Sequence, residues 1–239
     1  MEKKIYKTET HLHTAETSSC SALDAEKQIN AYAEKGYSTI FVSDHLRKKF
    51  YSDEFCSGPN DYITGVTRFL RGYYRAKELG EKYGITVLMS AEVNLGGNDH
   101  LLYGIDEKFL CMDPPIPTLG SKGLYNRACE HGVTVIGAHP FRGDRRPKAD
   151  FLHGLEIVNA ADNHYHINNN EKALALAEAM PHMLRTSGSD CHHIEDVGRG
   201  GILTDHKITS AEDFINVLKS GNYEIIDISP EKAAEEQAK

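Results

Sequence analysis

The sequence has no run of about 18 consecutive apolar residues, so it offers no helix long enough to cross a bilayer. Its first residues, MEKKIYKTETHLH, lack the apolar core of a secretion signal. Cysteine is scarce and odd in number, and no CxxC pair occurs among Cys20, Cys56, Cys111, Cys129 and Cys191. A disulfide framework and a thiolate zinc motif are therefore unsupported. We predict a cytoplasmic protein in which Cys20 and Cys191 only pack.

Positively charged residues are also few: the sequence has 27 Lys and Arg but 35 Asp and Glu, which gives a formal net charge of −8. This balance disfavours broad nucleic-acid binding, which needs basic patches, but it permits a small anionic substrate. The 239 residues are 40% hydrophobic, which fits a single core. We predict one domain over residues 1–228 and a charged tail over 229–239. The sequence carries no signal for the oligomeric state.

Apolar, β-branched runs alternate with helical patterns along the chain. The predicted strands are Ile5–His11, Thr39–Ser43, Thr86–Ala91, Leu101–Gly104, Val133–Ala138, Gly154–Asn159 and Met183–Ser187. The predicted helices are Asp24–Lys35, Tyr62–Tyr83, Lys122–His131, Asn169–Ala179 and Ala211–Ser220. This alternation indicates parallel β/α units, arranged either in an open doubly wound sheet or in a closed barrel.

Polar side chains recur at successive strand ends, and this favours the barrel. They are His11 and His13, Asp44 and His45, Glu92, His139, Asn159, and then Asp190 and His192. In α/β barrels the active site forms where the carboxyl ends of the strands meet. Residues i and i+2 on a strand share a face, so both imidazoles of an HxH pair reach one site. Each motif alone is weak, but their recurrence predicts a metal cluster of histidines and carboxylates.

The ordered series HxHT, SDH, AE, HLLYG, AHP and GSDCHH, spread over residues 5–204, resembles the polymerase and histidinol phosphatase (PHP) family. The resemblance implies a distorted (β/α)7 barrel, a trinuclear metal site and hydrolysis of phosphate esters. The ligand positions that it implies are His11, His13, His45, Glu92, His100, His139, Asp190 and His192. The family usually places an Asp or a His shortly after HxH, and here Glu16 is the nearest replacement.

The resemblance also implies how the substrate is held and cleaved. Two to three divalent ions (zinc, manganese or iron) would activate a water molecule for attack on phosphorus. Arg142 and Arg199 follow ligand loops and are expected to clamp phosphate, whereas Arg145, Arg146 and Lys148 are expected to be solvated. A further substrate contact is expected from Asn159. Asp190 or His192 would help handle the proton.

Several activities remain open at this point. A small phosphomonoester of the nucleotide or histidinol-phosphate type is the preferred substrate, followed by a nucleoside bisphosphate or oligonucleotide end, and by protein phosphotyrosine. A metal-dependent amidohydrolase also uses HxH in a barrel, but no lysine stands at a predicted strand end here. A non-catalytic PHP-like module would have lost several of the ligands.

Overall fold

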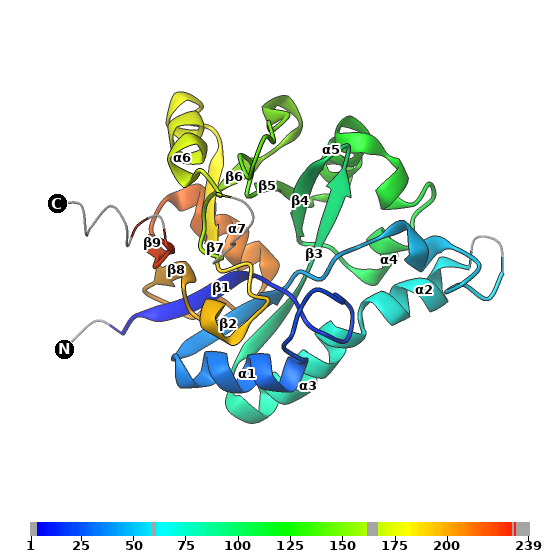
Figure 1. Ribbon diagram of the computed structural model, residues 1–239, viewed down its shortest axis with the longest axis horizontal. Coiled ribbons are helices and arrows are strands. Elements are labelled where there is room, and N and C mark those ends of the chain that lie inside the picture. Colours follow the sequence, from blue (N-terminus) through cyan, green and yellow to red (C-terminus); the bar gives the residue numbers. More distant parts are fainter. Residues whose placement is uncertain (1–3, 59–60, 162–166, 231, 233–239) are drawn as a thin grey trace.

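A computed structural model describes residues 4–58, 61–161, 167–230 and 232. Nine strands form one mixed sheet in the order β7-β6-β5-β4-β3-β2-β1-β8-β9 (Figure 1). The strands are β1 (Tyr6–Leu12), β2 (Tyr37–Val42), β3 (Thr86–Leu95), β4 (Asn98–Tyr103), β5 (Thr134–Ala138), β6 (Gly154–Asn159), β7 (Leu184–Gly188), β8 (Gly200–Thr204) and β9 (Glu224–Asp227).

The helices lie in the connections between the strands. They are α1 (Ala25–Glu34), α2 (Tyr62–Phe69), α3 (Arg71–Tyr83), α4 (Glu107–Leu110), α5 (Gly120–His131), α6 (Asn170–Ala179) and α7 (Ala211–Ser220). The short 3₁₀ helices are η1 (Lys48–Tyr51), η2 (Ile116–Thr118), η3 (Ala149–Phe151) and η4 (Ile194–Asp196). No helix in these described ranges is long and apolar enough to span a membrane.

The sheet curls until its seventh strand lies against its first. Leu12 forms a parallel bridge with Cys191, and Thr10 Oγ1 donates to the Ser187 carbonyl over 2.6 Å. The Ser187 hydroxyl in turn donates to the carbonyl of Ile226 in β9. Figure 1 shows β7 beside β1 and β8. The sheet is therefore a nearly closed, barrel-like α/β structure, and the predicted barrel class is confirmed.

The strand directions differ in part from the prediction of parallel units. β4 runs antiparallel to both β3 and β5, because only Gly96 and Gly97 separate it from β3 and so short a turn joins antiparallel strands alone. Both glycines have positive φ. β8 and β9 were not predicted; β8 pairs antiparallel with β1 and β9 pairs with β8.

Local signals set several helix ends. The Asp24 carboxylate accepts from Lys27 N and begins α1, while Gly84 and Gly132 end α3 and α5 in the left-handed conformation. The predicted helix over residues 62–83 is two helices that meet at Leu70. Gly72 in the first turn of α3 lets that helix approach closely, since a Cβ there would collide with Thr14 and Asp44.

The division into residues 1–228 and a tail over 229–239 stays a prediction. Of the tail, residues 231 and 233–239 lie outside the described part of the chain.

Candidate metal centre

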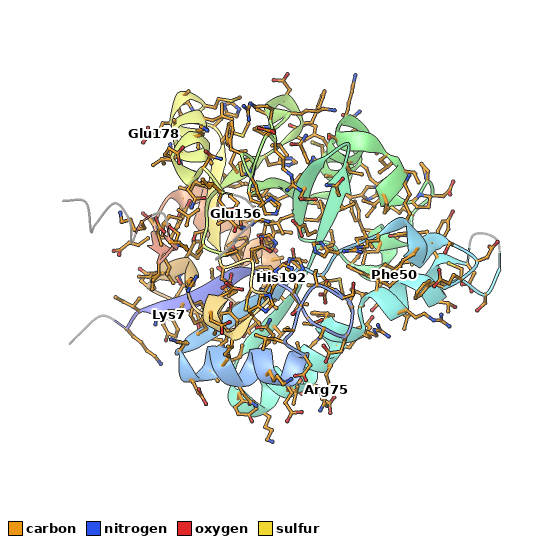
Figure 2. All side chains as sticks on the ribbon, viewed as in Figure 1. Lys7, Phe50, Arg75, Glu156, Glu178 and His192 are labelled. Atoms are coloured by element: carbon orange, nitrogen blue, oxygen red, sulfur yellow. The ribbon has the colours of Figure 1, made fainter. Side chains whose placement is uncertain are left out.

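The side chains at the carboxyl ends of the strands converge on one cavity of about 780 Å³. In Figure 2 the labelled side chains of His192 and Glu156 lie near the centre of the molecule, where these strands meet. The lining residues are Cys20, His45, Arg47, Glu92, Asp99, His139, Arg142, Arg145, Ala161, Asp190, His192, His193, Glu195 and Asp196. His11 and His13 lie fully buried beneath this lining.

Glu92 is the carboxylate at the centre of the cluster. Its Oε1 lies 2.9 Å from His139 Nε2, and its Oε2 lies 2.9 Å from His45 Nδ1. The same Oε2 lies 3.4 Å from His13 Nε2. Burial would raise the pKa of Glu92, but the charge of His45 and hydrogen bonds from the neighbouring imidazoles hold it well below its usual value. Glu92 is therefore ionised and central.

Asp190 is the second carboxylate of the cluster. Its Oδ1 lies 3.1 Å from His13 Nε2 and 3.3 Å from His11 Nε2. Burial would raise its pKa, but His11 and Arg142 outweigh burial and hold the pKa well below the usual range. Both carboxylates are thus charged although they are almost fully buried.

The donor set fits divalent metal ions. Four groups of residues each bring ligand atoms within 4.8 Å of one another: His13, His45 and His192; His11, His13 and Glu92; His11, His139 and Asp190; and Glu92, Asp99 and His139. His11 Nε2 lies 3.1 Å from His13 Nε2, and buried Glu92 Oε2 has no hydrogen-bond partner among the described residues. A buried carboxylate oxygen without a hydrogen-bond partner lowers the stability of the fold unless a cation binds it. Imidazole and carboxylate together suit zinc, manganese or iron.

Carboxylates behind the cluster orient its ligands. Glu156 Oε1 accepts from His11 Nδ1 over 2.8 Å, and its Oε2 accepts from the His139 backbone N–H over 2.8 Å. The His11 bond fixes its tautomer and leaves Nε2 as the free donor atom, a common arrangement behind metal-bound histidines. Asp44 accepts from the hydroxyl groups of Thr14 and Ser18, both at 2.6 Å. Asp44 therefore braces the loop after β1.

Two residues of the cluster hold strained backbone conformations. His139 has φ 30° and Asp190 has φ 50°, a region that residues other than glycine seldom occupy. Such strain persists where the surrounding structure imposes it, and it often marks a functional site. Gly188 lies under the cluster, where an added Cβ would collide with His11 Cβ. The absence of a side chain at Gly188 therefore allows the segment that carries Asp190 to approach His11.

Arg142 ties the cluster to β6. Its Nη2 donates to Asp190 Oδ2 over 2.6 Å and to Asn159 Oδ1 over 2.8 Å, and its Nε donates to Asn168 Oδ1 over 2.7 Å. Burial would lower its pKa, but the charge of Asp190 raises the pKa above its usual value. Arg142 is a fixed cation at the wall of the cavity.

The structure brings together most of the residues that the sequence singled out, but His100, Glu16 and Arg199 lie elsewhere, and Asn159 lies behind the cluster, where its Nδ2 donates to Asp190 Oδ2 over 3.3 Å. His100 is on the far face of β4, where it pairs with Val93, while its neighbour Asp99 faces the cluster and lies 3.8 Å from His139 Nε2. The Glu16 carboxylate turns away to accept from Ala25 N. Asn159 is fully buried, and neither it nor Arg199 is among the described lining residues.

Other residues in or beside the cluster were not predicted from the sequence. Arg145 was expected in solvent, but it lines the cavity and pairs with Asp99. Asp99 was overlooked in favour of His100, because strand alternation identifies the inward residue only once the pairing of β4 with β3 is known. Glu156 lies inside the apolar run GLEIVN, where one charged residue between buried neighbours was the available signal. Cys20 was expected to pack, yet it is exposed beside His45 and His192.

The position of Glu16 leads to a prediction that differs from the ligand assignment. Glu16→Ala is expected to leave the metal-to-protein ratio unchanged and to lower stability by about 1 kcal/mol, because it removes an acceptor from the first turn of α1. Elemental analysis and urea unfolding measure the two effects, with exposed Glu34→Ala on the same helix as the control. A lower metal content in Glu16→Ala alone would restore Glu16 as a ligand.

Comparisons with known proteins agree with this geometry. Residues 168–223 match the family model PHP_C, described as PHP-associated. A search of curated proteins gave no match. A two-domain protein from Bacteroides vulgatus, said to contain a predicted PHP-like metal-dependent phosphoesterase, aligns with TM-score 0.66 and 13% identity over 94% of this chain and 65% of its own.

Two further structures share the fold. PsfC from Pseudomonas syringae aligns with TM-score 0.64 and 15% identity, over 89% of this chain and 88% of its own. A lesion-specific endonuclease from Pyrococcus furiosus aligns with TM-score 0.57 and 16% identity, over 93% of this chain and 58% of its own. This chain therefore spans less than two thirds of the first and last of these proteins. The chain shares the fold of a PHP-like phosphoesterase, and the match of residues 168–223 to the PHP-associated family model agrees with the resemblance that its motifs carry.

Proposed function

We propose that the protein is a metal-dependent phosphoesterase that hydrolyses a small phosphate monoester. One observation carries the proposal: histidine nitrogens and ionised carboxylates converge in a cavity whose wall also holds Arg47, Arg142 and Arg145. Divalent ions bound by His11, His13, His45, Glu92, Asp99, His139, Asp190 and His192 would supply Lewis-acid catalysis and lower the pKa of water. Arginine and metal ions together suit a phosphate group.

The residues of the chain have separable roles in this proposal. Glu92 holds His45 and His139 from the two sides of the cavity. His192 donates from Nδ1 to the Asp190 carbonyl over 2.7 Å, which leaves its Nε2 for the cluster. Arg142 steadies Asp190 through Nη2, and among the described residues nothing bonds its Nη1, so Nη1 is the guanidinium nitrogen that can meet a phosphate oxygen.

The size of the cavity supports a small substrate. A volume of about 780 Å³ is in the range of pockets that bury most of a small molecule. The net negative charge of the chain also argues against a long nucleic acid.

One observation favours a second candidate, a nucleoside bisphosphate or an oligonucleotide end. A hollow of about 440 Å³ adjoins the main cavity, shares Arg142 and Arg145 with it, and adds Arg146. A second anionic group of the substrate would suit this hollow. The Pyrococcus furiosus endonuclease has the same fold, which is compatible with such a substrate.

Removal of the metal tests the proposal. Protein treated with a chelator is expected to lose p-nitrophenyl phosphate hydrolysis and to regain it with added manganese or zinc, because the proposed nucleophile is a water molecule activated by the bound metal ions. Bis(p-nitrophenyl) phosphate, nucleoside bisphosphates and an N-acyl amide are assayed beside it. Full activity at negligible metal content would refute the proposal. If the diester, the bisphosphate or the amide is cleaved in preference to the monoester, that compound class replaces the phosphomonoester as the proposed substrate.

A further inference from the structure

We propose that the Cys20 thiolate is a metal ligand, and that it completes a sulfur-containing site with His45 and His192. This inference rests on the proposed metal centre and adds one donor to it. Cys20 lines the same cavity as both histidines, and the neighbouring imidazoles of His192 and His45 outweigh its partial burial and lower the pKa of its thiol. It is the single cysteine among the described lining residues of that cavity.

The loop that carries Cys20 is fixed to the backbone of the cluster. Ala22 N donates to the His192 carbonyl over 2.9 Å, and Ser21 Oγ donates to the His13 carbonyl over 3.0 Å. On the other side of Cys20, Ser18 Oγ accepts from His45 N over 3.0 Å. The flanking residues are thus tied to all three histidines of the group, and the thiol is presented to the cavity by a braced loop.

The group of His13, His45 and His192 is short of a donor. The three imidazoles bring nitrogens within 4.8 Å of one another, and the ring centroid of His13 lies 4.4 Å from those of both His45 and His192. Zinc in proteins takes about four ligands. Glu16, the carboxylate expected to supply another, bonds to Ala25 instead. Independently, buried Glu92 Oε2 points at His45 without a hydrogen-bond partner, which marks this end of the cavity as a cation site.

A thiolate changes which metal the site selects. Thiolate is a soft ligand that favours zinc over manganese or magnesium, whereas the groups around His11, His139 and Asp99 offer only nitrogen and oxygen. Binding forms a metal–sulfur bond and releases the thiol proton to solvent. The centre would therefore hold zinc beside His45 and His192 and accept harder ions at its other positions.

Cobalt(II) is the spectroscopic probe for this bond. The chelator-stripped full-length protein is titrated with cobalt chloride, and a sulfur-to-cobalt charge-transfer band is expected in the near ultraviolet, together with the visible d–d bands. Cys20→Ser and Cys20→Asp are expected to lose the charge-transfer band, while Cys129→Ser, which removes an exposed thiol on α5, keeps it. Cys20→Asp is expected to retain more bound metal than Cys20→Ser, because its carboxylate replaces one donor with another.

Alkylation gives a second readout that is independent of catalysis. Zinc is expected to slow iodoacetamide modification of Cys20 about tenfold or more, and to leave Cys129 unaffected, as measured by peptide mass spectrometry. In Cys20→Ser, zinc affinity at this site is expected to fall by about 10- to 100-fold.

The possible outcomes separate this inference from the proposed function. Visible d–d bands without a charge-transfer band, or a charge-transfer band that survives in Cys20→Ser, would overturn the cysteine ligand while leaving the metal centre intact. If cobalt gives no bands at all and elemental analysis finds no metal, both proposals fall together.

Discussion

Glu92→Gln is expected to lower phosphate-ester turnover about a thousandfold, which corresponds to roughly 4 kcal/mol of transition-state stabilisation. The same substitution is expected to reduce the bound metal by about one ion per chain. Glu92 lies between His45 and His139, at 2.9 Å from a ring nitrogen of each. Glutamine has nearly the same shape, so the substitution removes charge and one donor atom without leaving a void. The amide N–H groups would also face imidazole nitrogens that are needed as donors to metal.

The measurement combines elemental analysis with steady-state kinetics on folded protein. Glu81→Gln, an exposed position on α3, is the control for the chemical change alone. Circular dichroism establishes that both variants retain their secondary structure. Normal metal content and normal turnover in Glu92→Gln would remove Glu92 from the centre and, with it, the assignment of the cavity as a metal site.

The parts of the centre that could be predicted from the sequence are those carried by strand ends. His11 and His13, and likewise Asp190 and His192, stand at i and i+2 at or just beyond the end of a strand, and the chain order of the strands specifies which ends meet in a barrel. The strand candidates of β1 to β7 all correspond to observed strands. Local pattern alone was therefore enough to single out these four side chains.

The errors arise where the direction of a strand or a loop decides the outcome. His100 and Asp99 are adjacent, so they face opposite sides of β4, and the choice between them requires knowing that β4 pairs antiparallel with β3. β8 and β9 are short and begin or end near glycines and charged residues, so their periodicity is faint. Such features are set by long-range pairing and not by local sequence.

The loop after β1 shows the same limit at the level of single side chains. Glu16 and Cys20 are four residues apart, and the sequence alone favoured the Glu16 carboxylate as the metal ligand. In the structure the Glu16 carboxylate accepts from Ala25 N at the start of α1, whereas hydrogen bonds of Ser18 and Ser21 anchor the loop so that Cys20 lines the cavity with His45 and His192. No local rule predicts which of two polar residues a helix start will capture.

Arg142→Ala is expected to lower kcat/KM about tenfold to a hundredfold, corresponding to a charge-assisted bond of roughly 1.5–3 kcal/mol. Two effects contribute. Asp190 loses the donor at 2.6 Å that holds its Oδ2, and the cavity loses a fixed cation beside the expected position of the phosphate. The second effect is measured separately through the inhibition constant of inorganic phosphate, which is expected to rise with the loss of that cation.

Arg142→Lys and Arg75→Ala complete the test. Lysine keeps the charge but cannot bond Asn168, Asn159 and Asp190 in the planar arrangement of Arg142, so partial rescue of phosphate binding with incomplete recovery of turnover is expected. Arg75 pairs with Glu78 on the surface, and its removal is expected to change neither constant. If Arg142→Ala loses bound metal but keeps its affinity for phosphate, then Arg142 acts only by positioning Asp190. If both kcat/KM and phosphate inhibition stay normal, Arg142 has no part in the site.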